Sequence, residues 1–360
     1  TPFSLFQDNL LSVLHDKDHS IVNLESPITE CHNPVIKTGR NFKAPIKNIE
    51  FIKKGGFDAV NLANNHIRDH GDEGVLDTLK YCDLNNIRTV GAGKNLESAK
   101  IPLLLNIKNK SIGILNYCEK EFNIAAKNKA GANPFDLIDA YNDIILLKKT
   151  CNYVFVIYHG GIEYVHYPTP QMVKDFKFLI DIGADAIISH HTHAYSGFIY
   201  YKNKPIIFGL GELYLETKND KISSENLIGL LIRLNLSESD QIDIKIIPTY
   251  QNIEKQSICL LEGFEKQRVL RQIEKISSTI SNINQFENFW ANYYLQEEKI
   301  TKVLLFSNNK FTYRLRKNLP FMNQRISKYN LINILNLMRC ESHRNKCVNI
   351  LENIYNDKFF

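Results

Sequence analysis

The sequence lacks several features that would place a protein in a specialised class. Its seven cysteines, in 360 residues, are scattered and include no Cys-x-x-Cys pair. This odd number and spacing argue against a disulfide framework or a zinc knuckle and indicate reduced, mostly buried thiols. No apolar run approaches the roughly 18 residues that a membrane-spanning helix needs. No signal peptide is visible, and the chain begins at Thr1 rather than at methionine, so we expect a missing or removed upstream segment.

A dense block of one charge is also absent. The formal net charge is +5, and lysine and arginine are spread along the chain. The densest basic stretch, RLRKNLPFMNQR at residues 314–325, is typical of a solvated face, with contact to an anionic lipid or polymer as the alternative. Specific nucleic-acid binding is therefore not expected.

The chain does contain enough apolar sequence for a substantial core. Hydrophobic residues make up 44% and charged residues 23%, which argues against disorder. Short β-type runs alternate with helical spacing up to about residue 215, a hairpin is indicated at 108–110, and antiparallel strand pairs follow. Beyond about residue 260 the periodicity is helical. We predict an α/β domain over residues 1–258 and a helical region over residues 259–360.

Residues that suit metal ions follow four of the β-type runs. They are Asn23 and Glu25; Asn64, Asn65 and His66; His159; and His190, His191 and His193. Because ligands of α/β sheets collect at the carboxyl ends of strands, we expect these side chains to meet at one rim. Carboxylate, amide and imidazole groups suit Mn, Fe and Zn, and two such ions can activate water for hydrolysis. The joint pattern favours a di-metal hydrolytic site.

Each element alone has a simpler explanation. A single histidine at a strand end, such as His159, is more often a hydrogen-bonded structural residue. The Asn-Asn-His sequence also suits a turn, because asparagine tolerates left-handed conformations. Glu25 precedes Ser-Pro and would also suit a turn, and a His-x-His pair occurs by chance in many proteins. The site is favoured because the strand-end placement recurs.

These residues carry a resemblance to a known family. The segments NLESPIT, GFDAVNLANNHIRDHG, GAG, YHGGIEYVHYPTPQ, GADAIISHHTH and KPIIFGLGELYLE occur in this order over roughly residues 15–217. They resemble the CapA family, the capsule or poly-γ-glutamate biosynthesis proteins of bacteria, within the calcineurin-like metallophosphoesterase superfamily. The resemblance implies a metallophosphoesterase-like αββα sandwich of two packed mixed sheets flanked by helices, to which the C-terminal helical region is appended. It also implies one or two divalent transition-metal ions, of Mn, Fe or Zn.

The resemblance assigns metal-binding roles to five residues. Glu25 takes the place of the bridging carboxylate, and Asn65 that of the ligand asparagine. His159 matches the single-histidine ligand, and His191 and His193 match the closing pair, one for each metal. These assignments are expectations from the family pattern.

Further roles follow from the same resemblance. His66 matches the histidine that assists the leaving group or stabilises the transition state, and Asp69 is expected to orient it. His190, the extra histidine of the CapA form, is expected to lie behind the ligands. Candidates for substrate contact, with a packed loop as the equal alternative, are Glu163, Tyr164 and Gln171, to which Glu212 is added.

The chain departs from the family pattern in two places. The family's first strand normally ends in Gly-Asp, whose carboxylate holds the first metal, and no such strand precedes Glu25. Either that strand lies upstream or the first site is incomplete. Asp16, Asp18 and His19 precede the strand that delivers Glu25, so we interpret them as a loop. Glu212 stands where the family usually has asparagine, which either alters the charge at the rim or has no effect.

Three functions are compatible with this pattern. The first is a metal-dependent hydrolase that cleaves a phosphoester or related bond in capsule or surface-polymer biosynthesis, with His66 aiding the leaving group. The second is a non-catalytic assembly or export factor that holds an anionic polymer or a phosphorylated or lipid-linked intermediate, while the helical region docks a capsule-assembly partner. The third is a degenerate relative with a structural role. We expect a bacterial protein that is cytoplasmic or envelope-associated.

Overall fold

The computed structural model describes residues 5–37, 39–216, 223–237, 241–306 and 328–359. It forms two compact units, one comprising Thr1–Val35 and Asn41–Ser281, the other Ile36–Arg40 and Asn282–Phe360. This division differs from the predicted boundary at 258/259 by one helix, α7 (Gly263–Ser281), which belongs to the first unit. The basic stretch at 314–325 lies outside the described residues.

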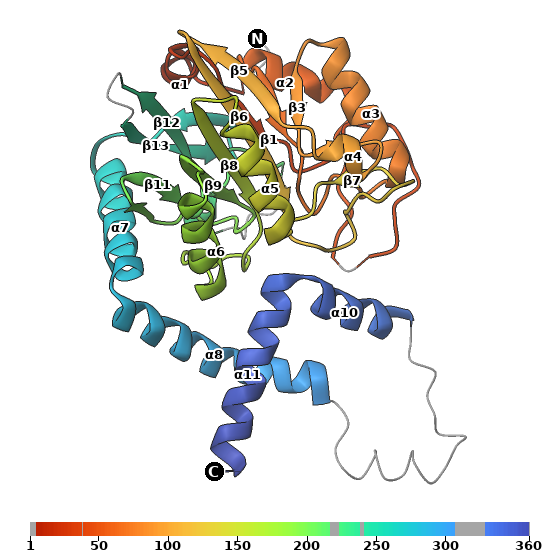
Figure 1. Ribbon diagram of the computed structural model, residues 1–360, viewed down its shortest axis with the longest axis vertical. Helices are drawn as coiled ribbons and strands as arrows, with labels where there is room; N and C mark the ends of the chain where they lie inside the picture. Colours follow the sequence, from red (N-terminus) through yellow and green to blue (C-terminus); the bar gives the residue numbers. More distant parts are fainter. Residues whose placement is uncertain (1–4, 38, 217–222, 238–240, 307–327, 360) are drawn as a thin grey trace. The chain divides into compact units, whose positions relative to one another are not determined.

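A six-stranded sheet runs through the first unit (Figure 1). Its strands, in spatial order, are β10 (Phe198–Tyr201), β11 (Lys204–Ile207), β9 (Ala186–His190), β8 (Tyr153–His159), β6 (Lys110–Cys118) and β5 (Leu103–Ile107). The four inner strands are parallel, and hairpins make both edge strands antiparallel. Each hairpin turns through two residues with positive φ, at 108–109 and 202–203, which confirms the predicted hairpin and the first of the antiparallel pairs expected after it.

Two smaller sheets face this one. A parallel sheet contains β1 (Ile21–Asn23), β2 (Ala59–Asn61) and β3 (Arg88–Val90), and an antiparallel sheet contains β12 (Ile228–Leu236), β13 (Ile242–Asn252) and β14 (Ser257–Leu260). Side chains from all three sheets share one buried core, which includes Val90, Ile114, Phe155, Ala186 and Ile242. Because alternate residues of a strand point to opposite faces, one face of the six-stranded sheet supplies this core. Two sheet layers therefore pack face to face.

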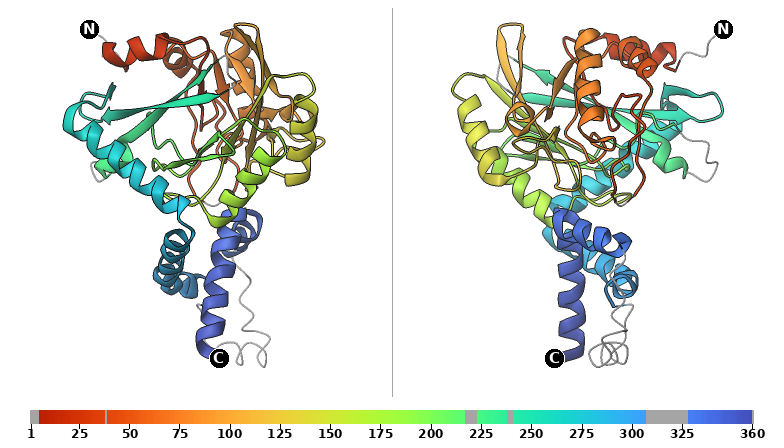
Figure 2. Two further views of the ribbon diagram at one scale, coloured as in Figure 1. Left: turned by 60° about the vertical axis from the view of Figure 1, so that its left-hand side comes forward. Right: turned by 90° about the vertical axis from the view of Figure 1, so that its right-hand side faces the viewer.

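Helices cover both outer faces (Figure 2). On the side of β1–β3, a second core joins α1 (Asp8–His15), α2 (Ile49–Lys54) and α3 (Gly71–Leu84) to β2. On the far side of the six-stranded sheet, α5 (Leu137–Leu147) and α6 (Pro170–Asp181) bury Ile144 and Phe176. The remaining short elements are η1 (Ile46–Asn48), β4 (Ala92–Gly93), α4 (Leu96–Ala99), β7 (Gly131–Ala132) and η2 (Ser224–Leu227). The predicted sandwich of two sheets flanked by helices is confirmed.

From Ile283 onward, the described part of the second unit is helical. It contains α8 (Ile283–Phe306), α10 (Lys328–Arg339) and α11 (Glu341–Phe359), which confirms the predicted C-terminal helices. α8 and α11 are joined by Lys346, which pairs with Glu297 and lies 5.5 Å from the centroid of the Tyr293 ring. None of the helices in the described ranges is both long and apolar enough to cross a bilayer.

The contact between α6 and the six-stranded sheet gives a stability prediction. Phe176 is fully buried, stacked on Phe208 at a centroid distance of 5.9 Å and edge-on to Tyr158 at 5.1 Å. We expect Phe176→Ala to lower the free energy of unfolding by about 3–5 kcal/mol, because it leaves a cavity. Phe178→Ala, at a 37% exposed position of the same helix, should change it by less than about 1 kcal/mol. Urea unfolding measures both, and equal effects would contradict this packing.

Candidate metal centre

In the six-stranded sheet, the last residues of three neighbouring strands are register partners, so these strands end side by side. Cys118 at the end of β6 is paired with His159 at the end of β8, and His159 with His190 at the end of β9. In the facing sheet, Asn23 and Asn61 end β1 and β2 as register partners. Because the strands within each set are parallel, the residues that follow leave the sheets at one edge.

Glu25 is the point at which these strand ends converge. Its Oε1 lies 3.4 Å from His159 Nε2 and 3.7 Å from His193 Nε2. Asn65 Oδ1 lies 3.1 Å from the same nitrogen of His159. The His191 ring centroid is 4.9 Å from that of His159. We call these five residues, which come from four separate segments of the chain, the histidine–carboxylate cluster.

The polar atoms of the cluster match the needs of a bound cation. Glu25 Oε1 and His159 Nδ1 are shielded from solvent and have no hydrogen-bond partner among the described residues. Ligand atoms of Glu25, His159 and His191 all lie within 4.8 Å of one another. A shielded carboxylate oxygen is costly unless a positive charge or a donor faces it. Carboxylate, amide and imidazole donors together suit a divalent transition metal.

The charges of the cluster act on one another strongly. Burial alone would raise the pKa of Glu25, but the nearby charges of His159, His193 and His191 hold it well below its usual range. Burial, reinforced by the neighbouring His159 and opposed by Glu25, lowers the pKa of His190 to about 3. His190 is therefore neutral at pH 7, and Glu25 is charged.

His193 is held from both sides by carboxylates. Its Nδ1 is hydrogen-bonded to Glu212, while its Nε2 faces Glu25. Burial opposes protonation, but the bond to Glu212 and the charges of Glu25, Glu212 and Glu163 raise the pKa of His193 to about 9. Glu212, a candidate for substrate contact, is thus engaged with a histidine of the cluster.

Two asparagines orient the Glu25 carboxylate. Asn23 Nδ2 donates to Glu25 Oε2 at 3.0 Å, and Asn61 Nδ2 donates to Asn23 Oδ1 at 2.8 Å. Asn61 is buried within β2. The role of Asn61 was missed from sequence, although a polar residue inside an apolar strand must find a partner.

The Asn-Asn-His turn combines two roles. Asn64 Oδ1 accepts hydrogen bonds from the backbone N–H groups of His66 and Ile67, at 3.1 and 2.8 Å, so this asparagine shapes the turn. Asn65 is thereby left facing the cluster. His66 Nδ1 lies 2.7 Å from Asp69 Oδ2, which places Asp69 where it orients the ring.

The backbone around the cluster is strained at three residues with side chains. His191, His193 and Tyr164 have φ values of 97°, 51° and 62°. Residues other than glycine adopt this left-handed region at a cost, and such residues gather at functional sites. The turn after β9 therefore places its histidines at the expense of local stability.

The other candidates for substrate contact, Glu163, Tyr164 and Gln171, are exposed side chains. Glu163 and Tyr164 are exposed, and the Tyr164 ring centroid is 5.7 Å from that of His193. Gln171 is exposed on α6 and donates to Asp175 at 2.7 Å.

The acidic loop before β1 is separate from the cluster. Asp16 pairs with Arg233 and Asp18 pairs with Lys108, each at 2.8–2.9 Å. His19 lies 3.8 Å from Asp58. These contacts occupy the amino end of β1, whereas Glu25 follows its carboxyl end.

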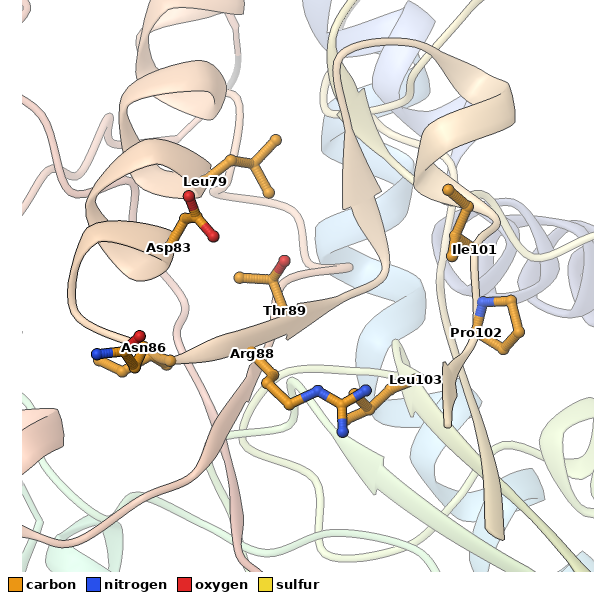
Figure 3. A pocket seen from close by; sticks show the side chains of 9 residues that line it. Leu79, Asp83, Asn86, Arg88, Thr89, Ile101, Pro102 and Leu103 are labelled. Carbon is orange, nitrogen blue, oxygen red and sulfur yellow. The ribbon is translucent and has the colours of Figure 1, made fainter. Parts of the chain in front are cut away.

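A surface pocket of about 460 Å³ lies elsewhere on the first unit (Figure 3). It surrounds the start of β3 and is lined by Leu79, Asp83, Asn86, Arg88, Ile101 and Leu103, among others. Because β3 runs parallel to β1 and β2, its start is at the opposite end from the residues that enter the cluster. The pocket holds no group of metal-binding side chains, so the candidate chemistry belongs to the cluster.

Comparisons with known proteins agree on one family. A family model described as "Bacterial capsule synthesis protein PGA_cap" matches residues 2–217. The capsule biosynthesis protein CapA of Bacillus anthracis is 28% identical over 281 residues, 74% of this chain and 66% of that protein. The PGA biosynthesis protein CapA of Bacillus subtilis is 28% identical over 209 residues, 57% and 55% of the two chains. The matched part thus spans two thirds or less of these relatives.

A structural similarity was also found. The solved structure of a putative 5′-nucleotidase from Staphylococcus aureus is 13% identical, with a TM-score of 0.40, covering 63% of this chain and 44% of that chain. At this level of similarity nothing about activity follows.

The buried Asp69 gives a prediction for this region. Its side chain is 1% exposed and accepts hydrogen bonds from the backbone of Phe42 and from His66, each at 2.7 Å. We expect Asp69→Ala to lower the free energy of unfolding by about 1–3 kcal/mol, because two donors lose their acceptor. Asp83→Ala, at an exposed position on α3, should stay within about 0.5 kcal/mol of the parent protein in the same urea titration. A loss no larger than that of the Asp83 variant would contradict the arrangement.

Proposed function

Since this chain belongs to the PGA_cap family of bacterial capsule synthesis proteins, we propose that it is a metal-dependent hydrolase of a phosphoester or related bond in the synthesis of a capsule or other surface polymer. The observation that carries the proposal is the environment of Glu25 Oε1. This oxygen is shielded from solvent, accepts no hydrogen bond from the described residues and faces the imidazole nitrogens of His159 and His193. A divalent cation held between these groups would satisfy the carboxylate.

The residues proposed to hold the metal are those of the histidine–carboxylate cluster, Glu25, Asn65, His159, His191 and His193. When bound, a divalent ion acidifies water and stabilises negative charge on phosphoryl oxygens. His190, kept neutral behind His159, adds no positive charge of its own at neutral pH. Mn, Fe and Zn all suit this donor set.

His66 is the proposed proton donor to the leaving group. Its Nδ1 is bonded to Asp69, so the ring is fixed in orientation and Nε2 is the atom that exchanges a proton with the substrate. Asp69 is buried and accepts a hydrogen bond from the Phe42 backbone as well, which holds this carboxylate in place. The pair thereby supplies a positioned acid beside the cluster.

The proposed substrate is an anionic polymer or a phosphorylated or lipid-linked precursor of one. The relatives from the two Bacillus species are named for capsule and PGA biosynthesis, which supports a setting in polymer synthesis. Capsule-assembly proteins are the proposed partners.

Removal of one metal-binding side chain tests the proposal. We expect the purified chain to bind Mn²⁺ or Zn²⁺ and to hydrolyse bis-p-nitrophenyl phosphate, and His159→Ala to lower metal affinity and kcat/KM at least about 100-fold. His15→Gln, an exposed histidine on α1, is the matched control and should leave both unchanged. Isothermal titration with each metal and release of nitrophenol are the measurements.

Two outcomes would contradict this function in different ways. Failure of the purified chain to bind any of Mn, Fe and Zn would remove the metal site. Metal binding without hydrolysis of any phosphoester, combined with retained binding of an anionic polymer, would favour the assembly or export role instead.

Glu212 gives a second test. Its bond to His193 Nδ1 directs Nε2 of that ring toward Glu25, the arrangement by which a carboxylate orients a metal-binding histidine. We expect Glu212→Gln to weaken metal binding about tenfold or more. Glu216→Gln, at an exposed position four residues away, should bind metal like the parent chain. Equal affinities for the two variants would show that Glu212 does not act on the metal site.

A further inference from the structure

The residues of the candidate metal centre come from two sheet layers. Glu25 and Asn65 follow strands of the β1–β3 sheet, whereas His159 ends β8 of the six-stranded sheet. The core between these layers is made of apolar side chains, and hydrophobic attraction is non-directional. A metal site needs its ligands held to within about 0.5 Å. Directional contacts between the layers are therefore needed close to the ligands.

Asn116, in β6 of the six-stranded sheet, makes such a contact. Its Oδ1 accepts a hydrogen bond at 2.8 Å from the backbone N–H of Ala63, two residues before Asn65. Its Nδ2 donates at 3.2 Å to the carbonyl of Ile157, two residues before His159. One side chain thus joins the turn that carries Asn65 to the strand that carries His159.

Asn123 makes a second link to the same turn. This residue follows β6, and its Nδ2 donates at 2.8 Å to the carbonyl of Asn64. Asn64 in turn donates through its own Nδ2 to the carbonyl of Leu24, at 2.8 Å. Because Leu24 precedes Glu25, the links continue to the segment that carries the carboxylate of the cluster. We call Asn64, Asn116 and Asn123 the asparagine bridge.

The asparagine bridge is fully buried, and each of its side chains is at most 1% exposed. A buried amide costs free energy unless it is hydrogen-bonded, whereas an apolar side chain at the same place has no such cost. Satisfied polar networks of this kind hold a core in one arrangement. A Cβ at Gly91 would lie 2.0 Å from Asn116 Oδ1, so the glycine leaves the space that this amide occupies. Close packing and hydrogen bonds together therefore fix the Asn116 side chain.

We propose that Asn116 is a positioning residue of the metal centre, because it fixes Asn65 of one sheet layer relative to His159 of the other. Asn116 lies outside the histidine–carboxylate cluster and acts through these two residues. The separation that it maintains is that between Asn65 Oδ1 and His159 Nε2, 3.1 Å. The inference rests on the proposed metal-binding role of the cluster, and it adds the residue that sets the spacing of the ligands.

The test compares metal affinity with stability in variants of the full chain. Mn²⁺ binding is measured by isothermal titration, and Tm is measured without metal. We expect Asn116→Leu, which fills the space but makes no hydrogen bonds, to raise the Kd for Mn²⁺ about tenfold or more, the size of loss typical when groups that orient metal ligands are removed. Asn123→Ala breaks the second link from a loop outside the strands. It should raise this Kd as well, and it serves as the test if Asn116→Leu does not fold.

Tyr117→Phe is the matched control. Tyr117 is the next residue of β6, is fully buried and donates to Asp143 of α5 at 2.8 Å. Because neighbouring residues of a strand point to opposite faces, its hydroxyl is remote from the bridge. The variant loses a buried hydrogen bond and should have a lower Tm, but its Kd for Mn²⁺ should equal that of the parent chain. Crystal structures of the metal-free bridge variants should show Asn65 Oδ1 and His159 Nε2 farther apart than in the parent.

The outcomes separate this inference from the proposed function. An unchanged Kd in both bridge variants, with Tm lowered as in Tyr117→Phe, would show that the bridge only stabilises the fold. An equal loss of affinity in Tyr117→Phe would show that affinity merely follows stability, and it too would overturn the positioning role. Failure of the parent chain to bind Mn²⁺ would refute the metal site, and the separation of Asn65 and His159 in the variant crystals would then decide the inference by itself.

Discussion

A carboxylate oxygen held among imidazole rings is the constraint on which the site depends. Glu25 Oε1 is removed from solvent and lies 3.4 Å from His159 and 3.7 Å from His193, too far for short hydrogen bonds and near enough to share a cation. Asn23 donates to the other carboxylate oxygen, and Asn61 donates to Asn23 in turn, so the two asparagines together orient the Glu25 side chain. A shielded carboxylate oxygen that lacks a hydrogen-bond donor among the described residues is the physical reason to place a metal there.

Strand register and a strained turn bring Glu25 and the histidines together. Parallel pairing sets the ends of β6, β8 and β9 level, and the facing β1 and β2 bring their own carboxyl ends to the same edge. The turn after β9 then adopts left-handed backbone at His191 and His193. Stability from the two packed cores offsets this local strain, because strained residues persist only where the surrounding structure determines them.

The helices, strands and turns that depend on neighbouring residues are predictable from the sequence. The hairpin at 108–110, the antiparallel strand pairs that follow the alternating region and the helical periodicity beyond residue 260 each depend on neighbouring residues, and all appear as expected. Asn61 and Phe42 escaped notice because their partners depend on strand register and on a loop without periodicity. The packing of α7 on the first unit also depends on tertiary contacts that an amphipathic pattern does not specify.

The central claim is that the histidine–carboxylate cluster is a metal site, and anomalous diffraction tests it most directly. Crystals of the full chain grown with Mn²⁺ would be measured at wavelengths on either side of the manganese absorption edge. The account predicts an anomalous peak within coordination distance of Glu25 Oε1 and His159 Nε2. A crystal with manganese bound elsewhere and none at the cluster, or one in which Glu25 Oε1 accepts an ordinary hydrogen bond from the protein, would contradict it.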